Sequence, residues 1–328
     1  MTNRHRIHRK LVTALSIGTV LLAAPAYARE SGNVFRIGVL LPAITSVEEG
    51  LRQGLGRLGY VEGQQIVIEW RRSDGSYEEL RTLAAEVVRS RPDVIVAVGT
   101  SSAQAASAAT STIPIVFMSG DPVGRGLVKS LAQPGGNSTG LSVTSPDLTA
   151  KRLEFLRQVV PRFRHIVYVG NSASPAVGPQ LQQAAEAAAA SVGVQLVTLN
   201  ASDAAELKKA LGAIRLSRAD GVLISSDLLF AVYQAQIAQA IREAKLPAIF
   251  PYQESHEDGA LMSFGVSLRE TMRRAAAYVD KILRGAKPAE LPVEEISTYK
   301  LIIDLRVAHQ LGIEFPPALL LRADEVIR

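Results

Sequence analysis

The feature that most constrains the fold is the regular alternation of short apolar runs with longer amphipathic ones. Phe35–Leu41 (FRIGVLL), Gln65–Trp70 and Val94–Val98 (VIVAV) predict strands, and Val47–Leu58 and Tyr77–Ser90 predict the helices between them. Continuous Val/Ile/Leu runs without polar alternation are typical of strands that are covered on both faces. Repetition of strand, helix and strand predicts right-handed crossovers and parallel sheets, so the expected fold class is α/β.

The same alternation starts again after Pro134–Gly140, a segment of dense turn residues that predicts a loop. A second series of strands and Ala-rich helices then runs from residue 149 to residue 250. We therefore expect two doubly wound lobes. Lobe 1 is predicted to hold residues 35–145 plus about 260–290, and lobe 2 residues 146–259 plus about 291–328, so that the chain crosses between lobes more than once.

The first 28 residues have the pattern of a secretory signal peptide. Arg4, Arg6, Arg9 and Lys10 form a basic start, and Leu11–Ala24 is an apolar run too short to span a membrane. Ala26-Tyr27-Ala28 then supplies the small-x-small cleavage pattern, so we expect cleavage after Ala28 and export to the periplasm. An uncleaved anchor helix is the alternative.

Charge and cysteine content exclude several classes of function. The chain has 36 Lys+Arg and 31 Asp+Glu, and removal of the four basic residues of the signal leaves 32 against 31. This balance offers no strong basic patch, so we expect no nucleic-acid partner. The absence of cysteine excludes disulfides, thiol catalysis and a lipid-modified cysteine anchor.

Candidate binding residues follow from the rule that open parallel sheets bind ligands outside the carboxyl ends of their strands. The rule selects polar residues, or a residue of a tight turn, directly after predicted strands. In the first lobe these are Pro42, Thr100, Ser101, Ser102, Ser119 and Asp121, and in the second Asn171, Asp227 and Tyr252.

The segment Gly99–Ser102 is the most informative of these loops. Hydroxyls follow a glycine where a helix is expected to begin, and free N–H groups at a helix N-terminus suit a carboxylate or another anion. Asp121 or Asp227 could receive an ammonium group, and Tyr252 could supply an aromatic wall. The alternative is structural, since Ser, Thr and Asp cap helices and turns in most proteins.

Several signals of catalysis fail on context. Gly54-x-Gly56-x-x-Gly59 matches a dinucleotide-binding pattern, but it lies within a predicted amphipathic helix instead of a strand-to-helix turn. The five histidines do not match a zinc pattern, and none follows a predicted strand end. We therefore predict a protein without catalytic residues, metal or cofactor.

Longer stretches of the chain resemble one family. They include RIGVLLP (Arg36–Pro42), DVIVAVGTSSAQAA (Asp93–Ala106), TIPIVFMSGDPVGRGLVKSLAQPGGNSTGLS (Thr112–Ser142), KRLEFLRQVVP (Lys151–Pro161) and YVDKILRGAKPAELPVE (Tyr278–Glu294). In these stretches the sequence is similar to the ABC-transporter substrate-binding proteins of the tryptophan/tyrosine type. The loops near Ser101 and Asn171 depart from a Pro-containing form that is common in the family.

The resemblance implies a type I periplasmic-binding-protein fold, in which two Rossmann-like, doubly wound lobes close around a ligand by a hinge. It implies the solute-binding component of an ABC importer, with a small-molecule ligand that is an amino acid, possibly aromatic, and a permease partner in the inner membrane. A monomer suits such delivery. Two alternatives remain at this stage: a receptor of the same fold that presents its ligand to a membrane sensor, and an exported two-lobed enzyme.

Overall fold

The computed structural model describes residues 34–73, 76–143, 147–160, 162–174 and 177–328. The predicted signal peptide, residues 1–28, lies outside this range. No helix in these ranges is both long and apolar enough to cross a bilayer.

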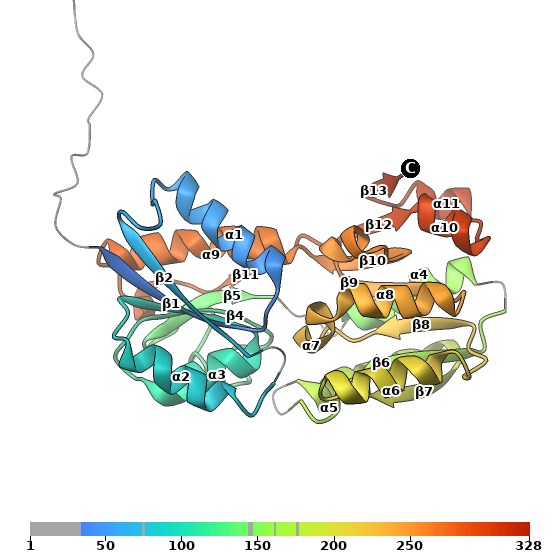
Figure 1. Ribbon diagram of the computed structural model, residues 1–328, viewed down its shortest axis with the longest axis horizontal. Coiled ribbons are helices and arrows are strands. Elements are labelled where there is room, and N and C mark those ends of the chain that lie inside the picture. Colours follow the sequence, from blue (N-terminus) through green and yellow to red (C-terminus); the bar gives the residue numbers. More distant parts are fainter. Residues whose placement is uncertain (1–33, 74–75, 144–146, 161, 175–176) are drawn as a thin grey trace, which may run out of the picture. The chain divides into compact units, whose positions relative to one another are not determined.

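The first sheet has six strands in the order β11-β5-β4-β3-β1-β2 (Figure 1), all paired in parallel. Its strands are β1 (Phe35–Leu41), β2 (Ile66–Arg72), β3 (Val94–Val98), β4 (Ile115–Ser119), β5 (Ser138–Ser142) and β11 (Glu294–Glu295). The connecting helices are α1 (Thr45–Arg57), α2 (Leu80–Arg89) and α3 (Thr100–Ala109). Because β1 lies between β2 and β3, the direction of winding reverses at β1.

The second sheet has seven strands in the order β13-β12-β10-β9-β8-β6-β7. The strands are β6 (His165–Gly170), β7 (Gln195–Asn200), β8 (Gly221–Ile224), β9 (Ala248–Tyr252), β10 (Met262–Val266), β12 (Lys300–Asp304) and β13 (Glu325–Ile327). The helices that accompany them are α4 (Asp147–Val159), α5 (Gly178–Val192), α6 (Ala204–Ile214), α7 (Leu228–Val232), α8 (Gln234–Glu243), α10 (Leu305–Leu311) and α11 (Pro317–Leu320). All pairs are parallel except β10 with β12, and the winding reverses at β6. The predicted α/β class with two doubly wound lobes is confirmed.

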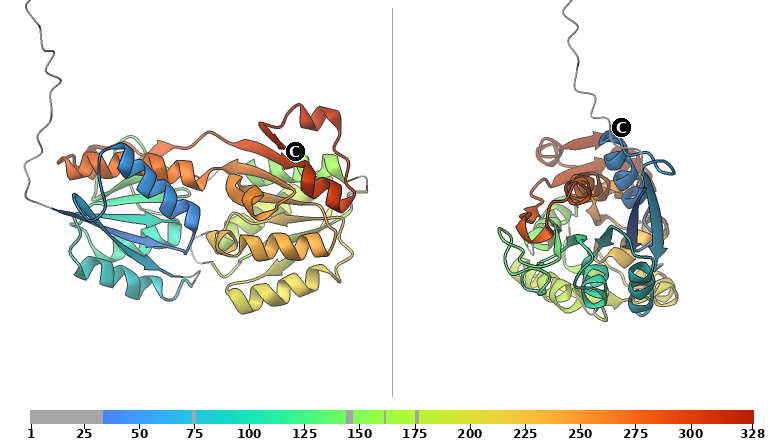
Figure 2. Two further views of the ribbon diagram at one scale, coloured as in Figure 1. Left: turned by 45° about the horizontal axis from the view of Figure 1, so that its top comes forward. Right: turned by 90° about the vertical axis from the view of Figure 1, so that its left-hand side faces the viewer.

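Helix α9 (Leu268–Leu283) follows a strand of the second sheet but packs against α1 of the first (Figures 1 and 2). A Cβ atom on Gly54 of α1 would lie 2.6 Å from Ala276 Cβ, so the two helices approach closely. The 3-10 turns η1 (Gln253–Asp258) and η2 (Pro288–Glu290) flank β10 and α9 along the chain. The chain therefore passes between the sheets after β5, after β10 and after β11.

This path differs in detail from the expected lobe ranges. The range of about 260–290 would place Met262–Val266 in lobe 1, whereas this strand pairs with β9 and β12 of the second sheet. The range from about 291 would place β11 in lobe 2, whereas it pairs with β5 of the first sheet. Strand membership depends on pairing between distant segments, which local sequence patterns do not report.

Strand β5 corrects the prediction of a loop over Pro134–Gly140. Its sequence STGLS has low strand propensity, but it pairs with β4 and is fully buried. A Cβ on Gly140 would lie 2.1 Å from the main-chain oxygen of Phe117, so glycine is required by close packing in the sheet.

Candidate functional site

A cavity of about 90 Å³ lies at the carboxyl ends of strands from both sheets. At about 10–15 Å³ for each water molecule, this volume has room for roughly six to nine waters, the scale of a small organic molecule. Seven predicted site residues line the cavity: Pro42, Thr100, Ser101, Ser102, Ser119, Asp227 and Tyr252. They follow β1, β3, β4, β8 and β9, as the strand-end rule requires.

The N-terminus of α3 forms one wall of the cavity. The N-cap is Gly99 with φ 92°, and no side chain caps the helix. The first N–H groups of α3 therefore have neither an acceptor within the helix nor a side-chain cap. A Cβ on Gly99 would lie 2.7 Å from Leu228 Cδ1. The structural alternative of side-chain capping by Thr100 or the following serines is therefore wrong at this helix.

Thr100 has a different structural role from capping. Its Oγ1 accepts hydrogen bonds of 3.1 Å from the Ser119 hydroxyl and from the Gly120 N–H. Only 7% of Thr100 is exposed. These bonds hold the ends of β3 and β4 together and leave the Thr100 hydroxyl proton available for an acceptor in the cavity.

Asp227 supplies a buried carboxylate from the second lobe and is only 1% exposed. Its Oδ1 accepts hydrogen bonds from the Tyr77 hydroxyl at 2.5 Å and from the Leu229 N–H at 2.9 Å. Its Oδ2 is buried and has no hydrogen bond of good geometry with any described residue, although the Ser174 hydroxyl lies close enough to lower the pKa of this carboxyl. Burial raises the pKa of Asp227, while the hydrogen bonds from Tyr77 and Leu229 act in the opposite direction.

Tyr252 supplies part of the aromatic wall. The ring lines the cavity, and its hydroxyl donates a 2.5 Å hydrogen bond to the Ser226 carbonyl. Burial raises the pKa of Tyr252, so the phenol stays protonated. The polar tip is therefore occupied within the protein, and the apolar face of the ring is the part available to a ligand.

Two predicted residues, Asp121 and Asn171, do not line the cavity. Asp121 is exposed, has φ 46°, and accepts a 3.0 Å hydrogen bond from the Gly124 N–H, which closes a turn. It follows β4, whose last residue, Ser119, does line the cavity. Asn171 follows β6 and is 3% exposed, and neither polar atom of its amide has a partner among the described residues.

Local sequence reasoning missed Tyr77 and Arg152, which both line the cavity. Tyr77 precedes α2 in a loop that does not directly follow a strand. Arg152 had a detectable signal, because it occupies the buried stripe of α4 together with Leu148, Phe155 and Val159. A cation on the apolar face of a helix is unusual and indicates a specific partner or a functional position.

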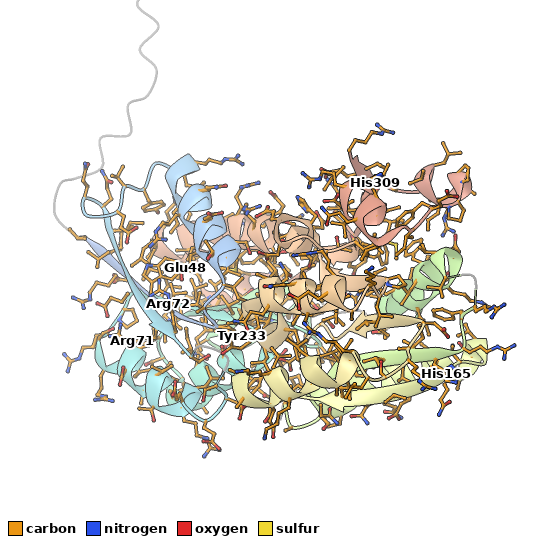
Figure 3. The ribbon with its side chains drawn as sticks, turned by 45° about the vertical axis from the view of Figure 1, so that its right-hand side comes forward. Glu48, Arg71, Arg72, His165, Tyr233 and His309 are labelled. Carbon is orange, nitrogen blue, oxygen red and sulfur yellow. The ribbon has the colours of Figure 1, made fainter. Side chains whose placement is uncertain are left out.

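The histidines of the described ranges do not line this cavity. His165 starts β6, and His309 lies on α10 (Figure 3); neither lines the cavity. No group of three or more His, Asp or Glu side chains among the described residues could hold a metal ion. The pattern Gly54-x-Gly56-x-x-Gly59 lies on α1 and just after it, as expected from its periodicity.

Comparison with known proteins gives a consistent result over nearly the whole chain. The ABC transporter substrate binding protein family matches residues 36–327. A tyrosine-binding protein of Clostridioides difficile is 27% identical over 265 residues, which cover 80% of this chain and 75% of that protein.

Solved structures agree with this match. A conserved domain protein of Vibrio cholerae is 31% identical, with a TM-score of 0.79 over 90% of this chain and 100% of that one. An ABC domain of Streptococcus pneumonia in complex with L-Trp is 27% identical, with the same TM-score and the same coverage of both chains.

Proposed function

Because the chain belongs to the ABC transporter substrate-binding protein family, we propose that it is the solute-binding component of an importer. Members of this family bind small-molecule ligands and work with ABC permeases. The proposed ligand is an amino acid, possibly an aromatic one, held in the cavity between the two lobes. No catalytic residue and no cofactor belong to this proposal.

The observation that carries the proposal is the pair of unlike polar groups that face one cavity. The α3 N-terminus offers N–H donors from the first lobe, and Asp227 offers an unpaired carboxylate oxygen from the second. A buried carboxylate with a free acceptor position favours an ammonium group, whereas helix N–H groups favour an acceptor such as a carboxylate. An amino acid carries both groups on one carbon atom.

The apolar part of the cavity supports the choice among amino acids. Leu80, Val98, Met118, Tyr252 and Val266 line it beside the polar groups. The names of two relatives, a tyrosine-binding protein and a complex with L-Trp, motivate aromatic side chains as the first candidates. A ligand that contacts both lobes stabilises their closed arrangement, which is the state that a permease would recognise.

The predicted signal peptide supports a periplasmic location for this activity. Cleavage after Ala28 would release the protein as a monomer that can diffuse to a permease in the inner membrane. N-terminal sequencing of the protein secreted by an expressing cell tests the cleavage site, and retention of residues 1–28 would contradict it.

The binding proposal is tested with the chain from Arg29 onward in thermal unfolding against single amino acids. A ligand present at 100 times its Kd adds about 2.7 kcal/mol to the free energy of unfolding, which is readily measured. Stabilisation by one group of amino acids, confirmed by calorimetric titration, supports the proposal. No stabilisation by any amino acid would contradict the ligand class while leaving the fold and family unchanged.

A further inference from the structure

Arg152 is a buried cation in the wall of the cavity. It lies in the second turn of α4, is 3% exposed, and lines the cavity together with Leu148 of the same helix. Burial of an unpaired charge is costly, so arginine is rarely this buried without a carboxylate partner.

The protein satisfies only one nitrogen of this side chain. Arg152 Nε donates a 2.8 Å hydrogen bond to the Phe264 carbonyl of β10. Its two terminal nitrogens form no hydrogen bond or ion pair with any described residue. The anchored Nε fixes the plane of the guanidinium and leaves the two terminal NH₂ groups available side by side.

Two buried carboxylates of the second lobe accept hydrogen bonds from other groups and not from Arg152. Asp227 Oδ1 accepts from Tyr77 and from the Leu229 N–H. Glu254 accepts from the Ser267 hydroxyl and from the first N–H groups of α9. Among the described residues, Arg152 therefore keeps a positive charge that the protein does not neutralise.

We propose that Arg152 binds the carboxylate of the ligand through its two terminal nitrogens. This inference rests on the proposed function, because it assigns the cavity to a ligand with an acidic group. Two parallel N–H···O bonds from a guanidinium match the geometry of a carboxylate better than any other pairing available in proteins. The N–H groups at the start of α3 then add hydrogen bonds, while Arg152 supplies the formal charge.

The electrostatics of the cavity agree with this assignment. Burial lowers the pKa of Arg152 to about 10, so the side chain remains charged at neutral pH. Asp227 and Arg152 both line the cavity but do not pair with each other. A zwitterion can satisfy both at once, its ammonium group at the carboxylate and its carboxylate at the guanidinium.

A structural role for Arg152 is the competing explanation, and Arg242 provides the matched control. Arg242 Nη1 donates to the carbonyls of Asp258 and Gly259, at 3.0 and 2.7 Å, and the side chain does not line the cavity. Replacing either arginine by glutamine removes a charge and a bond to a main-chain carbonyl. Only Arg152→Gln also removes the proposed carboxylate contact.

The test compares each acid with its neutral amide by calorimetric titration: L-tyrosine with L-tyrosinamide, L-tryptophan with L-tryptophanamide, and 3-phenylpropionate with 3-phenylpropanamide. Wild type and Arg242→Gln should bind the acid about 10- to 160-fold more tightly than the amide, which is the range for hydrogen bonds to a charged group. In Arg152→Gln this ratio should fall toward one and leave only the smaller preference that the α3 N–H groups supply, and in Arg152→Lys it should be intermediate.

Two outcomes overturn the inference: no preference for the acid in wild type, or an undiminished preference in Arg152→Gln. If both Arg152 variants fail to fold, a crystal structure of the wild type with the bound acid decides, since the carboxylate must lie within hydrogen-bond distance of Arg152. If the protein binds 3-phenylpropionate but none of the amino acids, the amino-acid proposal is contradicted. The role of Arg152 is then decided by comparing 3-phenylpropionate with 3-phenylpropanamide in the same variants.

Discussion

Replacing Asp227 by asparagine should weaken ligand binding without weakening the fold. Asparagine has the same shape, and its Oδ1 can still accept from the Tyr77 hydroxyl and the Leu229 N–H. What is lost is the charge, together with the acceptor at the unpaired Oδ2 position. A hydrogen bond to a charged group is worth about 1.5–3 kcal/mol, so the affinity for an amino acid should fall about 10- to 160-fold.

The stability of the same variant should respond to pH in a defined direction. Burial raises the pKa of Asp227, so the folded state favours the neutral carboxyl. That contribution is complete below the unfolded-state pKa of about 3.9 and is lost as pH rises through the folded pKa. Since asparagine cannot ionise, the free energy of unfolding of Asp227→Asn should rise relative to wild type as the pH increases above the unfolded-state pKa of aspartate.

Asp304 is a matched control because it is also 1% exposed and also caps a helix, α10. Although burial acts to raise the pKa of Asp304, hydrogen bonds from Arg306 and from main-chain N–H groups hold it below its usual value. Asp304→Asn should therefore lose stability at pH 7, lose less near pH 3, and leave ligand affinity unchanged. The assays are urea unfolding across this pH range and calorimetric titration at pH 7. Unchanged affinity in a folded Asp227→Asn protein would refute the assigned role of Asp227.

Further predictions concern neighbouring contacts. Tyr77→Phe removes a partly buried phenol and Tyr60→Phe a buried one, and each phenol donates to a carboxylate, so urea unfolding should show a loss of about 1.5–3 kcal/mol in both. Only the Tyr77 variant, which borders the cavity, should alter ligand affinity in titration. Thr100→Val leaves the Gly120 N–H without its acceptor, while the Ser119 hydroxyl can still donate to the Gly120 carbonyl, so urea unfolding should show a loss of about 1–3 kcal/mol. Unchanged stability would show that these bonds at the end of β4 are not needed. Gly54→Ala places a methyl group against α9 and should lower the thermal midpoint of unfolding. Gly56→Ala, with nothing within 4 Å of the added Cβ, should raise the free energy of unfolding by up to about 1 kcal/mol. Equal effects of the two substitutions would contradict the close packing of these helices.

The positions of many elements could be predicted from local patterns. Phe35–Leu41 and Val94–Val98 match β1 and β3, because apolar runs of this length are buried wherever a parallel sheet forms. Patterns failed where tertiary contacts override propensity. Strand β5 is polar and contains Gly140, and it forms only because β4 offers a main-chain edge at the required spacing.

The candidate site was predictable to the extent that strand ends bring residues together. Thr100 and Asp227 directly follow strands beside the reversal points of their sheets, so a rule about topology selects them. The same rule selected Asp121, which turns away to close a local turn. Tyr77 and Arg152 do not follow strands, and only the packing of α2 and α4 brings them to the cavity.

The sequence by itself determined the α/β class, the two doubly wound lobes and the loops that border the cavity, because hydrophobic periodicity and chain order act locally. Tertiary structure alone decided that β10 joins the second sheet while α9 packs on the first. It also decided that Arg152 lies in the cavity wall with no carboxylate partner among the described residues. These features depend on which distant groups meet and which polar atoms remain unpaired after packing, and no local pattern carries that information.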